Sequence, residues 1–197
     1  MWPEASNKTV LRGGHEVTIR PMTATDAQAL HRFFLALPEE DRLFLEDDVT
    51  KPAFVQQLLS EQEAGRAFPM VAEAGGEIVG YGVLYRPLFG WSTHVGRVRM
   101  AVARSFQRQG LGTAILRELV RKAQGLALDK LVAEVVEDQV GALRAFERLG
   151  FHREATLADH VRDLSGKKRD LVILANDVAH IWEHMEALVA DFEPSAG

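Results

Sequence analysis

The sequence predicts an α/β (α+β) fold in which a central sheet is flanked by helices. Short segments rich in β-branched residues recur along the chain, and amphipathic segments with helical periodicity separate them. One predicted strand, ending at Val102, leads through two glycines directly into a helix. At 197 residues, with 47% apolar and 26% charged residues, the chain fits one domain with a sizeable core.

The first part of the chain predicts one strand and two helices. Residues 17–21 alternate, are β-branched and end on a proline, so they form a strand. Thr25 or Asp26 caps the helix that follows. Its apolar stripe consists of Ala29, Leu30, Phe33, Phe34 and Leu37. Residues 38–51 are acidic and are expected to form a solvated loop, and residues 52–60 form a helix with proline at its first position.

The middle of the chain predicts a hairpin, a strand and a long helix. Residues 70–73 and 77–84 are the two strands of the hairpin, joined by a glycine turn. Residues 94–102 form the next strand. The helix over residues 110–124 ends at Gly125. Its buried stripe consists of Leu111, Ile115, Leu116, Leu119 and Val120.

The last part of the chain predicts three strands and two helices. Residues 131–136 form a buried strand, and residues 140–149 form a helix that stops at a glycine. Residues 151–161 and 168–175 are two further strands. The final helix spans residues 178–190, and its apolar stripe either covers the sheet or pairs two subunits in a homodimer. That stripe consists of Ile181, Trp182, Met185, Leu188 and Val189.

The turn between the strand that ends at Val102 and the following helix is suited to a polyanion. Backbone N–H groups at a helix start have no partner within the helix, and the helix dipole adds partial positive charge there. Gly110 and Gly112 allow an anion to approach the backbone closely. No Gly-Lys-Ser/Thr follows, and the first glycine of a dinucleotide-binding fingerprint is missing. Both of these other phosphate-binding motifs are therefore disfavoured.

The same residues resemble the acyl-CoA-binding motif of the GCN5-related N-acetyltransferases, the GNAT superfamily. In that motif Gln or Arg is followed by two residues, Gly, any residue, and then Gly or Ala, and Gln107, Gly110 and Gly112 occupy these places. Val102 stands at the family spacing before Gln107, whereas Arg104 replaces the usual proline.

A second segment strengthens the resemblance. Residues 139–151 are similar to the family's second signature, which ends on Gly-Phe, and residues 17–44 are similar to the start of bacterial protein-lysine acetyltransferase domains. The resemblance implies a GNAT domain over residues 16–176. Residues 1–15 are then an N-terminal extension, and residues 177–197 are a C-terminal helix and tail beyond the minimal fold.

This resemblance implies a twisted, mixed, mostly antiparallel sheet of about seven strands. It also implies acetyl-CoA as co-substrate and a primary amine of a small molecule or protein as acceptor. In many acetyltransferases the segment that corresponds to residues 38–51 lines the acceptor site. The acidic side chains here then have a second interpretation, which is that they attract the amine.

The CoA contacts implied by the resemblance follow the strand and the turn. The backbone near Met100, Ala101 and Val102 pairs with the pantetheine arm, and the turn meets the pyrophosphate. The turn residues are Gln107, Arg108, Gln109, Gly110, Leu111, Gly112 and Thr113. Gln139 stands where the family commonly has an Asn near the pantetheine, and Phe146 stands where many members have a proton-donating Tyr.

The proton path departs from the family pattern. Phenylalanine at position 146 has no proton to give to the leaving thiolate, so either water supplies it or activity is weaker. Arg97 and Arg99 occupy strand positions where the family often has a Glu base. The remaining candidates for the base are Glu134, Glu137, His94, Asp138 and Glu73.

These observations lead to the hypothesis of an acetyl-CoA-dependent N-acetyltransferase. The chain has no cysteine, so the amine attacks acetyl-CoA directly in a ternary complex rather than through a cysteinyl acyl-enzyme. The alternative is a catalytically weak acyl-CoA-binding or regulatory module, which the phenylalanine at position 146 motivates.

Composition disfavours several other classes. A formal net charge of -5 argues against nucleic-acid binding, although basic residues are expected to gather near the turn. These are His94, Arg97, Arg99, Arg104, Arg108, Arg117 and Arg121. The N-terminus has no basic and apolar leader, and no apolar run is long enough to span a bilayer, so a cytoplasmic protein without membrane contact is expected. His180 and His184 share a helix face but lack a third ligand, so we expect no metal.

Overall fold

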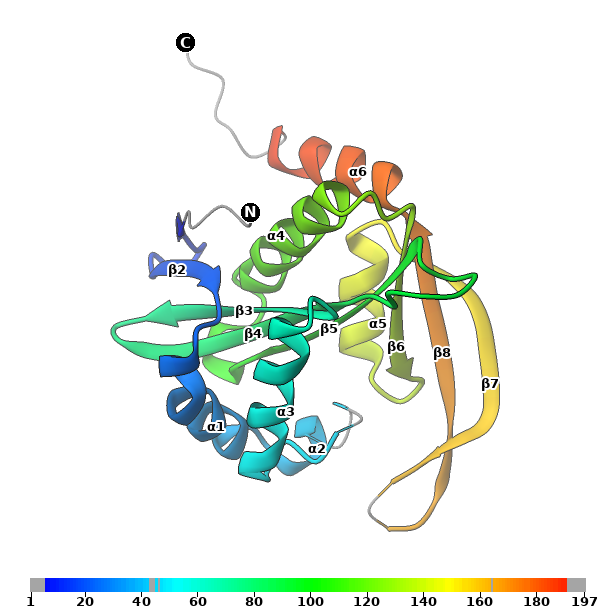
Figure 1. Ribbon diagram of the computed structural model, residues 1–197, viewed down its shortest axis with the longest axis horizontal. Helices are drawn as coiled ribbons and strands as arrows, with labels where there is room; N and C mark the ends of the chain where they lie inside the picture. Colours follow the sequence, from blue (N-terminus) through cyan, green and yellow to red (C-terminus); the bar gives the residue numbers. More distant parts are fainter. Residues whose placement is uncertain (1–5, 43–44, 46, 164, 191–197) are drawn as a thin grey trace.

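The computed structural model describes residues 6–42, 45, 47–163 and 165–190, and side chains up to residue 187. A mixed sheet of eight strands runs through the molecule in the order β1-β2-β3-β4-β5-β6-β8-β7 (Figure 1). The strands are β1 Asn7–Val10, β2 Glu16–Pro21, β3 Ala67–Ala74, β4 Glu77–Tyr85, β5 Val95–Val102, β6 Lys130–Val136, β7 His152–Arg162 and β8 Lys168–Asp177. All neighbouring pairs are antiparallel except β5 and β6.

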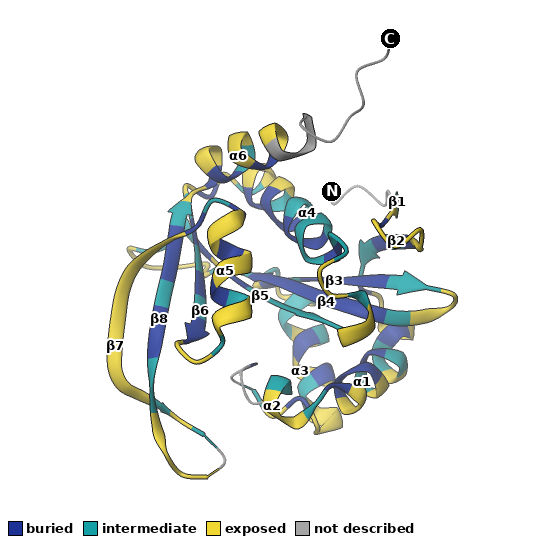
Figure 2. Cartoon of the chain, turned by 180° about the vertical axis from the view of Figure 1, so that it is seen from behind, coloured by how far each residue is buried: buried dark blue, intermediate teal, exposed yellow. Residues whose placement is uncertain are grey.

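Helices flank the sheet on both sides, which confirms the expected fold class (Figures 1 and 2). The helices are α1 Ala27–Ala36, α2 Glu39–Arg42, α3 Pro52–Glu63, α4 Leu111–Gly125, α5 Val140–Arg148 and α6 Val178–Ala190, with short 3-10 turns η1 Ala24–Asp26 and η3 Arg104–Phe106. Strand β1 is one more than the seven strands predicted. It lies in the segment assigned to an N-terminal extension, and its mostly polar sequence gave no strand signal.

Alternation along the strands divides the core into two parts. Met70 and Ala72 on β3 pack in the core that also contains α4, α5 and α6, whereas Val71 packs in the core of α1 and α3. On β4, Tyr81 and Val83 belong to the α1 and α3 side. The sheet therefore has an α1/α3 face and an α4/α5 face.

Two glycines bring α4 close to β4. A Cβ atom at Gly80 would lie 2.8 Å from Ile115 Cδ1, and one at Gly82 would lie 2.4 Å from Ile115 Cγ2. Real Cβ atoms do not approach other atoms this closely, so the absence of side chains at these positions sets the position of α4.

The C-terminal helix packs within the chain. Ile181 and Met185 of α6 are buried, and Trp182 lies under the guanidinium groups of Arg117 and Arg121 on α4. The described apolar face of α6 thus packs mainly against α4, and it also contacts β8 of the sheet. Leu188 and Val189 of the predicted stripe lie outside the residues whose side chains are described.

The two helix histidines are engaged separately. His184 Nε2 lies 2.9 Å from the carbonyl of Arg148, while His180 pairs with Asp177 at 3.4 Å. Across the described residues, no group of three or more His, Asp or Glu side chains is placed to hold a metal ion. No helix within these same residues is long and apolar enough to cross a membrane.

The acidic segment differs from the solvated loop that the sequence predicts. It contains the short helix α2, and Arg104 pairs with both Glu40 and Asp41 of that helix. Asp47 pairs with Arg99 on β5 at 2.7 Å. Arginine side chains on β5 and just after it thus hold the segment against the sheet. Phe44 and Glu46 lie outside the described residues.

Candidate functional site

Strands β5 and β6 separate partway along their length. They pair only from Val95 to Arg97 on β5, opposite Lys130 to Val132 on β6. Beyond this point β5 stays with β4 up to Val102, and β6 stays with β8 up to Val136. The two strands therefore diverge into a V, as Figure 1 shows, and their facing edges no longer pair with each other. Such edges offer N–H and C=O groups to an extended ligand that contains amides.

The residues expected to hold the pantetheine lie at this opening. Met100, Ala101 and Val102 form the end of β5, beyond the last residue paired with β6, and each is only partly buried. Through its other edge this part of β5 is held by β4, where Gly82, Tyr81 and Gly80 are the partners. A backbone N–H at this position can polarise a thioester carbonyl placed in the V.

The turn after β5 presents a helix N-terminus toward the same region. Gly110 has a φ of 95° and caps α4, and Arg108 also has a positive φ of 59°. The first helical hydrogen bond runs from the Ala114 N–H to the Gly110 carbonyl at 3.0 Å. The N–H groups of residues 111–113 therefore precede the helical ladder and, together with the helix dipole, favour an anion.

Gly112 leaves the space in front of this helix start open. Its φ is not positive, and a Cβ atom there would meet no atom within 4 Å. The fold itself therefore does not require glycine at this position. Close approach of a ligand to the backbone does explain it.

Two glutamine side chains of the turn form hydrogen bonds that stabilise it. Gln107 Nε2 donates to the Val102 carbonyl at 3.0 Å, and Gln109 Nε2 donates to the Ser105 carbonyl at 2.6 Å. The Gln109 carbonyl accepts a bond from the Arg12 N–H at 3.2 Å, which joins the β1–β2 loop to the turn. Arg108 is exposed and Thr113 is half-buried.

Gln139 and Phe146 of the second signature lie at the start and near the end of α5. Gln139 caps α5 directly after β6, and its carbonyl accepts the Leu143 N–H at 3.0 Å. Phe146 is buried, and its ring meets that of Phe151 edge-on at 5.2 Å between centroids. Phe146 thus packs in the core on the α4/α5 face.

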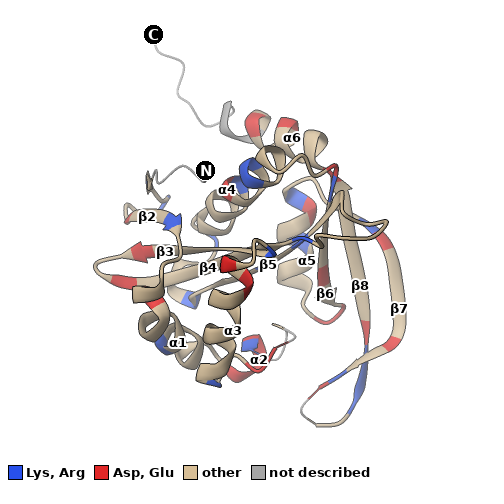
Figure 3. Cartoon of the chain, viewed as in Figure 1, with Lys and Arg blue, Asp and Glu red and all other residues tan. Residues whose placement is uncertain are grey.

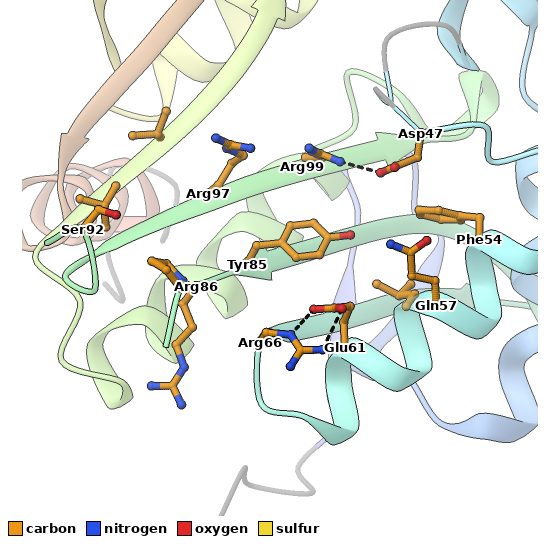
Figure 4. Close-up of a pocket in the computed structure, with 14 residues that line it drawn as sticks. Asp47, Phe54, Gln57, Glu61, Arg66, Tyr85, Arg86, Ser92, Arg97 and Arg99 are labelled. Atoms are coloured by element: carbon orange, nitrogen blue, oxygen red, sulfur yellow. Dashed lines mark hydrogen bonds and ion pairs between the residues drawn. The ribbon is translucent and has the colours of Figure 1, made fainter. Parts of the chain in front are cut away.

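A cavity of about 630 Å³ lies on the α1/α3 face of the sheet. Its walls come from α3, the end of β4, the β4–β5 loop, and the α1/α3 face of β5 and β6 (Figure 4). Two ion pairs lie within its lining, one between Arg66 and Glu61 at 2.6 Å and the other between Arg99 and Asp47. It lies on the opposite face of the sheet from α4, and we call it the acceptor-side cavity after the substrate that we propose to enter there.

The basic residues expected near the turn are dispersed instead. Arg97 and Arg99 face the acceptor-side cavity, and Arg117 and Arg121 lie against α6. Figure 3 shows Lys and Arg spread over both faces. Alternate residues of a strand point to the same face of a sheet, and residues four apart on a helix lie on the same side of it. Arg97 and Arg99 therefore share one face of the sheet, whereas Arg117 and Arg121 share the side of α4 that meets α6.

Glu134 is the base candidate placed closest to the V. It lies on β6 two residues beyond the last residue paired with β5, and its Oε1 is 3.1 Å from Arg97 Nε. The remaining candidates lie elsewhere. Glu137 and Asp138 follow the end of β6 and pair with Arg153 and Arg169.

Two further candidates are also distant from the V. Glu73 lies on β3, and it pairs with Arg20 of the neighbouring β2 at 2.9 Å. His94 is exposed and precedes β5, so it stands six residues, or about 20 Å, from Met100.

Two cavity residues were not assigned a role individually from the sequence, although the interpretation of the acidic segment as amine-attracting includes Asp47. Burial raises the pKa of Asp47 above its ordinary value and raises the pKa of Tyr85 to about 12. Tyr85 lies under the guanidinium of Arg99, 5.3 Å from carbon to ring centroid. The sequence does not indicate that a tyrosine in a hairpin and an aspartate in an acidic segment lie in one cavity, because only the tertiary fold brings them together.

Comparison with known proteins identifies the family. The profile described as Acetyltransferase (GNAT) family matches residues 28–151. The N-alpha-acetyltransferase RimI of Mycobacterium tuberculosis (strain ATCC 25618 / H37Rv) is 32% identical over 142 residues, which cover 70% of this chain and 79% of that relative.

Solved structures share the fold. RimJ of Mycobacterium smegmatis in complex with CoA-disulfide has a TM-score of 0.75 and 23% identity, covering 95% of this chain and 96% of that one. The GNAT domain of PAT from S. lividans has a TM-score of 0.72 and 20% identity, covering 87% and 96%. With a family profile over most of the domain and a relative above 30% identity, the chain belongs to the GNAT acetyltransferase family and is an N-acetyltransferase that uses acetyl-CoA.

Proposed function

We propose that the acetyl group passes directly from acetyl-CoA to a primary amine while both substrates are bound. The observation that carries this proposal is the V between β5 and β6, which opens beside the α4 N-terminus on one face and the acceptor-side cavity on the other. The pyrophosphate would lie at Gly110 to Thr113, and the pantetheine would lie along Met100 to Val102. The acceptor would enter from the opposite face.

The chemical step then needs no covalent enzyme intermediate. The neutral amine nitrogen forms a bond to the thioester carbonyl carbon, and the negative charge that develops on oxygen is stabilised by a backbone N–H at the end of β5. The C–S bond breaks, and the proton that the attacking nitrogen loses passes through water to the CoA thiolate. Phe146 has no part in this path, because its ring is buried and has no hydroxyl.

Glu134 is our proposed proton acceptor. Its side chain lies at the point where the strands separate, on the face that borders the acceptor-side cavity, and is 22% exposed. A carboxylate is a weak base because its ordinary pKa lies well below neutral pH. It suits an acceptor that needs little help to lose its proton.

An α-amino group fits this requirement better than a lysine side chain. With an ordinary pKa of about 7.7–8.0, roughly a quarter of α-amino groups are neutral near pH 7.4, against roughly one lysine in a thousand. The similarity to a protein named as an N-alpha-acetyltransferase supports the same acceptor. We therefore propose the α-amine of an amino acid or polypeptide as acceptor.

Release of free CoA thiol from acetyl-CoA across a panel of amines tests the proposal. The panel contains α-amines and ε-amines on otherwise matched compounds. We expect faster release with α-amines, and double-reciprocal plots that intersect as both substrates are varied. Parallel lines would contradict direct attack, and a preference for ε-amines would contradict the proposed acceptor. No release with any amine would favour the acyl-CoA-binding module.

A further inference from the structure

The loop between β4 and β5 carries an exposed aromatic surface. Within residues 86–94, which we call the aromatic loop, Phe89 is 87% exposed and Trp91 is 98% exposed, with the partly exposed Leu88 beside them. The other large exposed apolar side chains in the described part of the chain stand singly on separate elements: Val10, Leu35, Val140 and Leu157. Apolar groups gathered on one surface mark an interaction site more often than isolated ones do.

The aromatic loop is continuous with the acceptor-side cavity. Arg86, Pro87 and Ser92 of this loop line one end of the cavity, and Asp47 lies toward the other (Figure 4). Phe89 and Trp91 lie between these lining residues in the chain. A molecule that fills the cavity and continues beyond this end would therefore meet the two aromatic rings.

Hydrogen bonds to backbone carbonyl groups hold the loop at both ends. The Arg86 N–H donates to the Arg66 carbonyl at 2.9 Å, and Arg86 Nε donates to the Gly65 carbonyl at 3.1 Å. At the other end, the Val95 N–H donates to the Ser92 carbonyl, and the His94 carbonyl accepts the Asp129 N–H, both at 2.9 Å. Because the ends of the loop are tethered, its backbone loses less conformational freedom when a partner binds.

The length of β5 sets the size of molecule that can reach both the V and the aromatic loop. From Met100, at the V, to Val95, where the loop ends, five residues of strand span about 17 Å. An extended polypeptide covers about 3.3–3.6 Å per residue, so it needs roughly five residues for this span. An amino acid or other small amine bound at the V would end well short of Trp91.

We infer that the aromatic loop binds an apolar side chain of a polypeptide acceptor, about five to seven residues from the amine that is acetylated. The inference rests on the proposed function, because it places the acceptor amine at the V. It extends that proposal by selecting polypeptides over free amino acids and by assigning Phe89 and Trp91 as residues that set specificity. Contact with the rings contributes to acceptor binding and does not touch the reacting atoms.

Synthetic peptides with a free amino terminus test this inference. One pool contains decapeptides with Leu at positions 5 to 7, a second has Ser at those positions, and a third contains tetrapeptides, all with the same randomised first four residues. We expect kcat/KM for the Leu pool to exceed that of the other two at least about tenfold, which corresponds to about 1.4 kcal/mol. Equal values for the three pools would overturn the inference.

The double variant Phe89→Ser with Trp91→Ser assigns the effect to the loop. It is expected to lower the Leu-pool value to that of the Ser pool, while the tetrapeptide rate and the KM for acetyl-CoA stay unchanged. Val10→Ser, which removes an exposed apolar side chain on β1, should behave like the parent. An equal loss with tetrapeptides, or no loss with the Leu pool, would overturn the assignment.

Two measurements separate this inference from its rivals. If sedimentation shows that the parent dimerises, that the double variant is monomeric and that peptide kinetics are unchanged, the loop pairs copies of the chain and the inference is wrong. Peptide binding to the CoA-loaded protein is measured without turnover. Leu-dependent binding with no acetylation of any amine would refute the proposed chemistry and support the docking surface, whereas acetylation without Leu-dependent binding would do the reverse.

Discussion

Arg97 on β5 and Glu134 on β6 form an ion pair of 3.1 Å across the point where the two strands separate. The carboxylate thus lies on the α1/α3 face of the sheet, which borders the acceptor-side cavity. This position connects the break in strand pairing to the proton path that we propose for the acceptor amine.

Replacing Glu134 with Gln is expected to lower kcat/KM for an α-amine about a hundredfold near neutral pH, because a positioned base contributes at least that much. The loss should shrink above about pH 9, where the amine is already neutral. Steady-state rates across pH check this result. Glu137→Gln, an exposed carboxylate near the end of the same strand, is the matched control and should retain activity. A Glu134→Gln enzyme as active as the parent at pH 7 would remove Glu134 from the mechanism.

Replacing Gln107 with Ala is expected to weaken acetyl-CoA binding several-fold. The change removes the bond to the Val102 carbonyl that joins the turn to β5, at a cost of about 1 kcal/mol or less in the free energy of unfolding. Calorimetric titration with CoA and urea unfolding give the two quantities. Gln124→Ala, at an exposed position near the end of α4, should change neither. Unaltered CoA affinity in Gln107→Ala would show that this bond does not shape the site.

Replacing Asp26 with Asn is expected to lower the free energy of unfolding by about 2 kcal/mol at pH 7. Asp26 accepts bonds from Arg20 at 2.7 and 2.8 Å and from the Thr23 N–H at 2.8 Å. Burial is the largest single influence and raises the pKa of Asp26. The bonds from Arg20 and Thr23 together outweigh it, so the pKa lies below its ordinary value of 3.8.

A lowered pKa in the folded state fixes the pH dependence of this effect. The stabilisation is fully present above the unfolded pKa of about 3.8 and is lost as pH falls through the lower folded pKa. The free energies of unfolding of the parent and of Asp26→Asn, measured with urea, should therefore converge as the pH falls below about 3.8. A difference that stays constant down to pH 2 would contradict the assignment to the charged carboxylate.

Replacing Phe146 with Ala is expected to lower the free energy of unfolding by about 3–5 kcal/mol, because the ring is buried against Phe151. Chemical denaturation measures the change, with Val140→Ala on the exposed side of the same helix as control. Unchanged stability together with a selective rise in the KM for acetyl-CoA would mean that Phe146 contacts the cofactor instead.

The order of the helices and strands could be predicted from the sequence because hydrophobic periodicity depends only on residues close together in the chain. The hairpin before β5, the turn with Gly110 and the α4 stripe all depend on neighbours in the chain, and each was predicted close to its place. Strand β1 and helix α2 were missed because they are only four residues long and mostly polar. Such segments take their structure from a tertiary partner rather than from their own pattern.

The acceptor side was less predictable for a related reason. Asp47, Tyr85, Arg99 and Glu134 come from four separate segments. The register of β4, β5 and β6 places the last three on one face, and the ion pair with Arg99 places Asp47 beside them. Side-chain pairing also changed the expected charge pattern, since Arg104 is held by α2 and Arg97 by Glu134. Residue counts do not show which charges neutralise each other.

Binding of CoA to Gly112→Trp, measured by calorimetry, tests most directly whether the turn holds the pyrophosphate. The position has open space around it and no positive φ, so the variant should fold, and an indole there would block approach to the α4 N-terminus. Gly125→Trp, at the other end of the same helix and equally open, is the control. We expect CoA affinity to fall at least a hundredfold in Gly112→Trp and to stay at the parent value in Gly125→Trp. Parental affinity in a folded Gly112→Trp protein would contradict the placement of the cofactor.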